Sequence, residues 1–174
     1  MRPLRILLHI GTPKAGSTAI QHTCRAFESQ LLEAGILYPK VNSSAVSHKF
    51  LAFALCTDEE LPGHFRNLHK GKVEKKNRLF REEWNHICQQ VDKYKPHTLL
   101  LSTEHLFDGF THGRGEKLKE VLAELSDDVE VICYVRRPSA YYLSLTQQIL
   151  KSSAAMPAPK PVSYRGQLEQ CISL

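Results

Sequence analysis

The sequence lacks the features that mark several protein classes, beginning with paired cysteines. Its five cysteines are scattered along the chain, and no two of them form a C-x-x-C pair; they are Cys24, Cys56, Cys88, Cys133 and Cys171. This count and spacing argue against a disulfide framework and against a cysteine zinc site, and they favour a reducing compartment. We expect each cysteine to behave as a small buried hydrophobic residue.

Long hydrophobic runs and internal repeats are absent as well. Arg2 and Arg5 precede an apolar run that ends at Leu8, which is too short for the core of a signal peptide. No run approaches the roughly 20 apolar residues that a membrane helix needs. The sequence therefore predicts a soluble, cytoplasmic protein with no membrane partner.

Acidic residues are scarce in one segment, residues 64–81, which carries a single acid, Glu74. Its nine basic side chains are His64, Arg66, His69, Lys70, Lys72, Lys75, Lys76, Arg78 and Arg81. Such a segment could receive an anionic acceptor or a nucleic acid, but a solvated helix face is the more common outcome for a charge run. Because few aromatic side chains are available to stack on bases, we expect no nucleic-acid partner.

The overall composition is that of a globular domain. The chain has 174 residues, 42% hydrophobic and 24% charged, which fits a single domain over residues 1–174 with a sizeable core. Its formal net charge of +5 suits an anionic ligand without identifying one.

Three short apolar runs alternate with helical patterns along the chain. The runs, residues 4–10, 97–102 and 129–135, read as buried strands, and Gly35–Pro39 reads as a short extended piece. Apolar spacing predicts helices over residues 18–34, 45–56 and 116–125, and another through Trp84 that stops before Pro96. This alternation predicts an α/β fold, a parallel β-sheet flanked by helices. The proline-rich residues 152–161 read as a loop, and the helical pattern from Arg165 looks cut short at Leu174, so we expect an incomplete fold.

The stretch His9–Thr18 joins the first strand to the first helix and has the pattern of an anion cradle. Backbone N–H groups converge in such a turn, and the helix dipole adds roughly half a positive charge. Gly11, Gly16 and Thr18 fit the nucleotide-triphosphate loop G-x-x-x-x-G-K-[ST], but Ser17 stands where the lysine belongs. A lysine lies inside the loop instead, at Lys14, which argues against an ordinary ATPase.

A second arrangement follows the strand 129–135. Arg136 lies at the strand end, and Pro138 is well placed in the first turn of a helix because it has no N–H to satisfy. Ser144 then lies about two turns into that helix. The planar guanidinium fork of arginine suits phosphate. We interpret the adjacent Arg137 as a surface charge.

Together, P-K-A-G-S-T-x-x-Q after the first strand and the Arg136…Ser144 pair after a later strand resemble two signatures of sulfotransferases that use 3′-phosphoadenosine 5′-phosphosulfate (PAPS). The likeness is to bacterial and glycan-type members and covers about residues 4–150, including Gly35–Pro39. It implies a P-loop NTPase-like sulfotransferase fold. Family members continue for about another hundred residues, so the resemblance implies that this chain holds the N-terminal portion of the fold.

The resemblance implies roles for specific residues. The loop residues Pro13, Lys14, Ala15, Gly16, Ser17 and Thr18 would bind the 5′-phosphosulfate side of PAPS. Arg136 and Ser144 would grip its 3′-phosphate. Lys14 would neutralise charge on the oxygen that bridges sulfur and phosphorus as that bond breaks.

A proton acceptor for the hydroxyl that receives the sulfuryl group is expected after the central strand. Glycan-type members carry a catalytic glutamate there, which corresponds to Glu104. Small-phenol members use a histidine, so His105 is the alternative. His48 could also face the acceptor, although a lone histidine in a helix is more often structural.

The implied function is in-line sulfuryl transfer from PAPS to a hydroxyl acceptor, a carbohydrate above all, with no metal. Two alternatives are a catalytically reduced remnant that binds the product nucleotide or a partner protein, and a nucleotide kinase. The cut-short end favours the remnant, whereas the presence of Lys14, Glu104, Arg136 and Ser144 favours the enzyme. The displaced lysine and the lack of an evident magnesium-binding acid after an apolar strand oppose the kinase.

Overall fold

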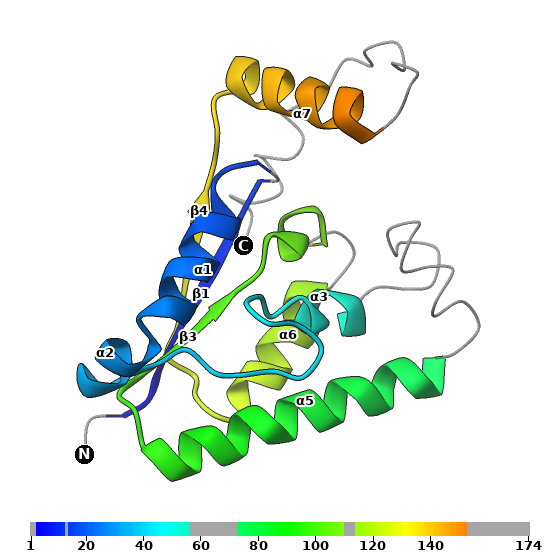
Figure 1. Ribbon diagram of the computed structural model, residues 1–174. Helices are drawn as coiled ribbons and strands as arrows, with labels where there is room; N and C mark the ends of the chain where they lie inside the picture. The colour runs from blue at the N-terminus through cyan, green and yellow to red at the C-terminus, as the bar shows by residue number, and fades with distance from the viewer. Residues whose placement is uncertain (1–2, 13, 56–72, 110–113, 153–174) are drawn as a thin grey trace.

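The structure is a computed structural model and describes residues 3–12, 14–55, 73–109 and 114–152 (Figure 1). In chain order its elements are β1 (Arg5–Gly11), α1 (Ser17–Ala26), α2 (Glu28–Glu33), β2 (Ile36–Leu37), α3 (Phe50–Leu55), α5 (Val73–Tyr94), β3 (Thr98–Ser102), the 3₁₀ helix η1 (Glu104–Gly109), α6 (Arg114–Ala123), β4 (Val129–Tyr134) and α7 (Pro138–Ser152).

The described strands form one four-stranded sheet in the order β2-β3-β1-β4, and every pairing is parallel. The predicted α/β class with a parallel sheet is confirmed. The sequence predicted three strands, and the short extended piece after Gly35 supplies the fourth, because Ile36 and Leu37 pair with Thr98 and Leu99.

Helices cover both faces of the sheet (Figure 1). Alternate residues of β1, namely Ile6, Leu8 and Ile10, belong to the main core with side chains of α3, α5 and α6. Trp84 on α5 is fully buried there. His9 lies on the opposite face of β1, which is the face that α1 covers. There His9 contacts Ser102, which in turn contacts Gln21 of α1. The apolar core thus occupies one face, and the other face keeps a polar side chain near the strand ends.

Two predicted helices have different bounds from those expected. The helix predicted over 18–34 is interrupted at Phe27, whose φ of −108° lies outside the helical range and separates α1 from α2. The helix predicted over 45–56 begins only at Phe50, so that prediction is wrong for residues 45–49. Tertiary hydrogen bonds outweigh helical periodicity there: the N–H of His48 donates to Ser102 O at 2.9 Å.

The bounds of the later elements follow the sequence closely, since α5 ends at Tyr94, β4 ends at Tyr134 and α7 begins at Pro138. The expectation that 129–135 is a buried strand is wrong, because no residue of β4 is buried. Within the basic segment, residues 73–81 belong to α5, where Arg78 pairs with Glu82 and Arg81 pairs with Glu124. This part is a solvated helix face, as expected, although Lys76 is buried.

Several predictions fall outside the described residues: Pro13, Cys56, Cys171, residues 64–72, the loop after Ser152 and the helical pattern from Arg165. Cys24 and Cys88 are half-buried, but Cys133 is exposed, so the expectation of a buried cysteine is wrong there. Cys133 lies on β4, at the edge of the sheet, where Val131 is also 50% exposed. Among the described helices, none is both long and apolar enough to span a bilayer.

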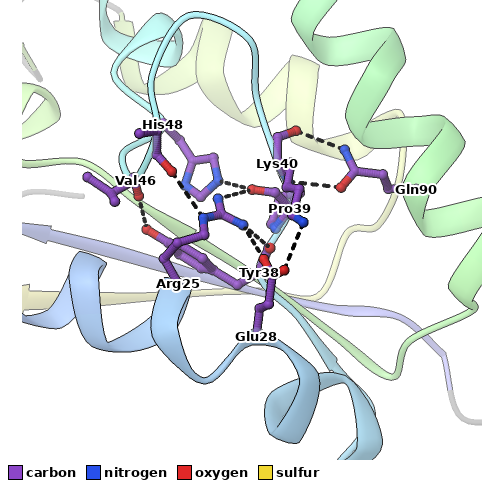
Figure 2. Close-up of polar contacts among 9 residues, drawn as sticks. Arg25, Glu28, Tyr38, Pro39, Lys40, Val46, His48 and Gln90 are labelled. Carbon is purple, nitrogen blue, oxygen red and sulfur yellow. Dashed lines mark hydrogen bonds and ion pairs between the residues drawn. The ribbon is translucent and has the colours of Figure 1, made fainter.

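The loop between β2 and α3 is fixed by polar contacts (Figure 2). Arg25 on α1 donates to three of its carbonyls, Tyr38 O, Pro39 O and Ala45 O, and pairs with Glu28 at 2.9 Å. The Tyr38 hydroxyl donates to Val46 O. The Gln90 side-chain amide accepts the N–H of Lys40 and donates to Lys40 O.

His48 closes this loop against the sheet. Its Nδ1 accepts the N–H of Ser102 at 2.9 Å, so the other ring nitrogen carries the proton and donates to Pro39 O at 3.1 Å. Burial lowers the pKa of His48 to about 4. Both ring nitrogens are occupied, and the side chain has no exposed surface. His48 therefore has a structural role, in agreement with the more common outcome for a lone histidine.

We expect the stability of the protein to fall as the pH is lowered from neutrality. The folded-state pKa of His48 lies below the unfolded value of 6.5, so the unfolded chain binds a proton first and the stabilisation present above pH 6.5 is lost towards pH 4. At 1.36 kcal/mol per pKa unit, urea unfolding at about pH 7.5 and about pH 5 should differ by about 2 kcal/mol from this group. His48→Gln should remove most of that difference, and His22→Gln, on the exposed surface of α1, should not. If the free energy of unfolding of His48→Gln depends on pH as strongly as that of the wild type, this assignment to His48 is wrong.

Candidate functional site

Three segments that follow strand ends meet at one edge of the sheet. Because all the described strands are parallel, their carboxyl ends lie at the same edge, where ligands of such sheets bind. β1 lies between β3 and β4, so the loop after β1 has η1 on one side and residues 135–137 on the other. The predicted site residues on Lys14–Thr18, Glu104–His105 and Arg136 thus share this edge.

The loop after β1 has an unusual backbone. Lys14 and Gly16 both have positive φ, 66° and 100°, and the N–H of Ala15 donates to Thr12 O at 3.1 Å. A side chain at Gly16 would be strained by that φ, although a Cβ there would meet nothing within 4 Å. The tight turn requires glycine at this position, and the space over it is open to a ligand.

Gly11 has a different function from the one that the loop pattern suggests. A Cβ on Gly11 would lie 2.7 Å from Tyr134 O, which is closer than real Cβ contacts. The next residue, Thr12, donates its N–H to the same carbonyl at 2.9 Å. Gly11 is therefore needed so that β1 and β4 can approach each other at the strand ends.

The start of α1 supplies backbone donors. Among the backbone hydrogen bonds of the described residues, none uses the N–H of Gly16, Ser17 or Thr18. These groups lie at the N-terminus of the ten-residue α1, where the helix dipole attracts anions. The Thr12 hydroxyl is buried and has no hydrogen-bond partner in the described part of the chain. The geometry is that of an anion cradle.

The predicted loop residues differ in exposure. Lys14 and Thr18 are exposed, Ala15 is half-buried and Ser17 is buried; Pro13 lies outside the described residues. The Lys14 side chain is therefore accessible to a ligand over the turn.

Arg136 connects the second motif to the loop. Its Nη1 donates to Lys14 O at 2.9 Å, although the two residues lie 122 positions apart in the sequence. Ser144 is half-buried on α7, and no described contact joins it to Arg136 or to the loop. Figure 1 shows α7 beyond the end of β4, at the carboxyl edge of the sheet but set apart from the main body. The structure brings together Arg136 and Lys14, and it does not bring Ser144 into contact with either.

Glu104 and His105 begin η1, directly after β3 and Thr103. Glu104 Oε2 accepts a hydrogen bond from Gln21 Nε2 at 2.9 Å, while Glu104 Oε1 lies 4.0 Å from His105 Nε2. The side chains of Glu104 and His105 are 26% and 33% exposed. Both are therefore accessible to a ligand, and Glu104 Oε2 accepts the hydrogen bond from Gln21 while Oε1 lies on the side of His105.

Sequence reasoning missed a group of buried polar side chains behind Glu104. Gln21 Nε2 also contacts Ser102 Oγ at 3.3 Å, and Ser102 Oγ lies 2.8 Å from His9 Nδ1. Burial lowers the pKa of His9, although the charge of Glu104 acts in the opposite direction. A histidine inside an otherwise apolar strand run was the available signal for His9, and the glutamine of P-K-A-G-S-T-x-x-Q was the signal for Gln21.

Chemically, this edge can bind an anion at the loop, place a cation beside it and offer a carboxylate as proton acceptor. Among the described residues, no three His, Cys, Asp or Glu side chains gather as metal ligands would. Comparison of this chain with models of protein families, with curated proteins and with solved structures found no match in any of the three.

Proposed function

We propose that this protein is a sulfotransferase that transfers a sulfuryl group from PAPS to a hydroxyl acceptor, a carbohydrate being the favoured class. The observation that carries the proposal is the hydrogen bond from Arg136 Nη1 to Lys14 O. Lys14 of the first signature and Arg136 of the second follow strands that are far apart in the chain, and they come into contact at the edge where a ligand would bind. A P-loop NTPase-like sulfotransferase fold belongs to the same proposal.

The loop fits the 5′ side of such a nucleotide. The N–H groups of Gly16, Ser17 and Thr18 and the buried Thr12 hydroxyl are donors without described protein partners, as an anionic group requires. Lys14 lies at the open side of the turn and adds a positive charge. PAPS supplies an activated sulfuryl group when it is bound, and these loop residues hold its anionic end.

Arg136 distinguishes this site from one for an ordinary adenosine phosphate. One guanidinium nitrogen is committed to Lys14 O, and the exposed remainder of the fork is available to a second phosphate beside the loop. Ser144 is proposed as a further donor to that phosphate from α7.

Glu104 is proposed as the proton acceptor. Its Oε2 is held by Gln21, so Oε1, on the side of His105, is the oxygen that faces an acceptor hydroxyl. His105 remains the alternative base, because the two residues are adjacent and similarly exposed.

A second candidate function is a binding protein for the product nucleotide without turnover. The position of α7 favours it, because no described contact brings Ser144 to Arg136 or to the loop. The exposed apolar residues Tyr142, Leu143 and Leu150 on α7 are consistent with a role in contacting a partner.

The first test concerns ligand choice. Calorimetric titration should show that 3′-phosphoadenosine 5′-phosphate binds at least tenfold more tightly than ADP, because a hydrogen bond to a charged group contributes about 1.5–3 kcal/mol. Arg136→Ala should remove most of this preference, whereas Arg137→Ala, a change to the exposed neighbouring arginine, should keep it. Equal affinity for the two nucleotides in the wild type would reject the assignment. Binding without sulfuryl transfer to any hydroxyl would favour the second candidate.

A further inference from the structure

The hydrogen bonds behind Glu104 have a defined direction. A carboxylate only accepts hydrogen bonds, so the side-chain amide of Gln21 must turn its NH₂ group towards Glu104 Oε2, 2.9 Å away. The second proton of that NH₂ group is then available to Ser102 Oγ at 3.3 Å. Gln21 therefore donates to both Glu104 and Ser102.

Ser102 is the second partner of this amide. A hydroxyl oxygen can accept two hydrogen bonds, so Ser102 Oγ can accept from Gln21 and from a protonated His9 Nδ1, 2.8 Å away, at the same time. Burial lowers the pKa of His9, which favours the neutral ring. His9 Nε2 is buried and has no hydrogen-bond partner in the described part of the chain. The direction of the two Gln21 bonds therefore does not depend on the tautomer of His9.

Gln21 occupies a position where packing alone does not require a polar side chain. Only Ser17 and Gln21 are buried on α1, and Gln21 is 3% exposed. A buried amide costs free energy unless it is hydrogen-bonded, and both described bonds of this one run towards the strand end and Glu104.

We propose that Gln21 is a positioning residue, which holds Glu104 as a hydrogen-bond acceptor with Oε1 turned to the acceptor side. The catalytic part of this inference rests on the proposed function. The hydrogen-bond direction does not, because it follows from the contacts alone.

The direction can be tested without turnover. In side-chain ¹H–¹⁵N correlation spectra of the full chain, the Gln21 NH₂ pair is assigned by Gln21→Leu. Glu104→Ala removes the acceptor, so one proton of that pair should move upfield and exchange faster with solvent. Glu120→Gln, an exposed change on α6, should leave the pair as it is. An unchanged Gln21 pair in a folded Glu104→Ala variant would overturn the inference, as would a rapidly exchanging pair in the wild type.

The catalytic part is tested by a double-mutant cycle. Gln21→Leu should lower turnover about 10- to 100-fold with nucleotide affinity nearly unchanged, the loss expected for one hydrogen bond to a charged group. In the Glu104→Gln background, the same change should cost less than about threefold, because the group that Gln21 positions is already disabled. Equal losses in both backgrounds would show that Gln21 only supports the fold. The expected Gln21 signals in a wild type that shows no sulfuryl transfer would reject the proposed function and retain the hydrogen-bond assignment.

Discussion

Replacing Glu104 by Gln should lower sulfuryl transfer by about 10²–10⁴-fold, the usual contribution of a general base, while affinity for the product nucleotide stays nearly the same. The substitution is close to isosteric. Its amide oxygen can still accept the hydrogen bond from Gln21 Nε2, so the start of η1 should keep its structure. What is lost is the ability to take a proton from the acceptor hydroxyl.

Two further variants show whether the loss of turnover is specific to Glu104. Glu120→Gln, an exposed change on α6, should leave both turnover and binding unchanged. His105→Ala should have a smaller effect than Glu104→Gln if His105 only lines the site. The opposite result, with full turnover in Glu104→Gln and a large loss in His105→Ala, would assign the base to His105. Steady-state turnover and calorimetric binding on the same preparations separate chemistry from folding.

Much of the fold could be predicted because local sequence and tertiary packing agree. The runs at β1 and β3 are largely apolar, as buried parallel strands require, and Pro138 marks the start of α7. The five-residue error before Phe50 has a different origin. Residues 45–49 have a helical pattern, but both the backbone N–H and the ring of His48 form hydrogen bonds with Ser102, which lies 54 positions away. The spacing of apolar residues carries no information about such a contact.

The site was predictable in part for the same reason. Lys14, Glu104 and Arg136 each follow a strand, and parallel topology alone gathers strand ends at one edge. The contact between Arg136 and Lys14 O depends on the strand order, which places β4 directly beside β1. The support of Glu104 by Gln21 depends on which face of β1 the first helix covers, and a single sequence does not specify that face.

The sequence spacing between Arg136 and Ser144 does not predict whether Ser144 reaches the site. Its distance from Arg136 in sequence fits the second signature, and it lies about two turns into α7, as predicted. Its contact with a ligand depends on the direction in which α7 leaves β4, which is set by packing rather than by spacing. In the described structure α7 is set apart from the sheet, so the role of Ser144 stays a prediction.

Lys14 is the residue on which the chemical proposal depends most. Its φ of 66° is unfavourable for any residue except glycine, yet a lysine holds the position, and its carbonyl is fixed by Arg136. The side chain is exposed and belongs to the turn rather than to the helix, where the lysine of a triphosphate loop would be. In the proposed reaction it would place charge near the bond that breaks.

We expect Lys14→Ala to reduce sulfuryl transfer by roughly 10²-fold or more, equivalent to about 2.7 kcal/mol, with a smaller loss in affinity for the product nucleotide. The reason is that negative charge develops on the leaving oxygen only in the transition state, so the cation matters more there than in the bound ground state. Lys14→Met should behave like Lys14→Ala, because it keeps most of the chain length without the charge. Adding magnesium should restore neither variant.

Single-turnover rate and product affinity, measured on the same variant, decide between the two possible roles of this lysine. A variant of the exposed Lys117 on α6 controls for the loss of one positive charge from the surface. Alanine at position 14 has a similar left-handed backbone cost to lysine, so a change in folding stability should not account for the loss of rate. If rate and affinity fall by the same factor in Lys14→Ala, the lysine binds ground state and transition state equally well. It is then a phosphate anchor, and stabilisation of the leaving group must come from the N–H groups at the start of α1.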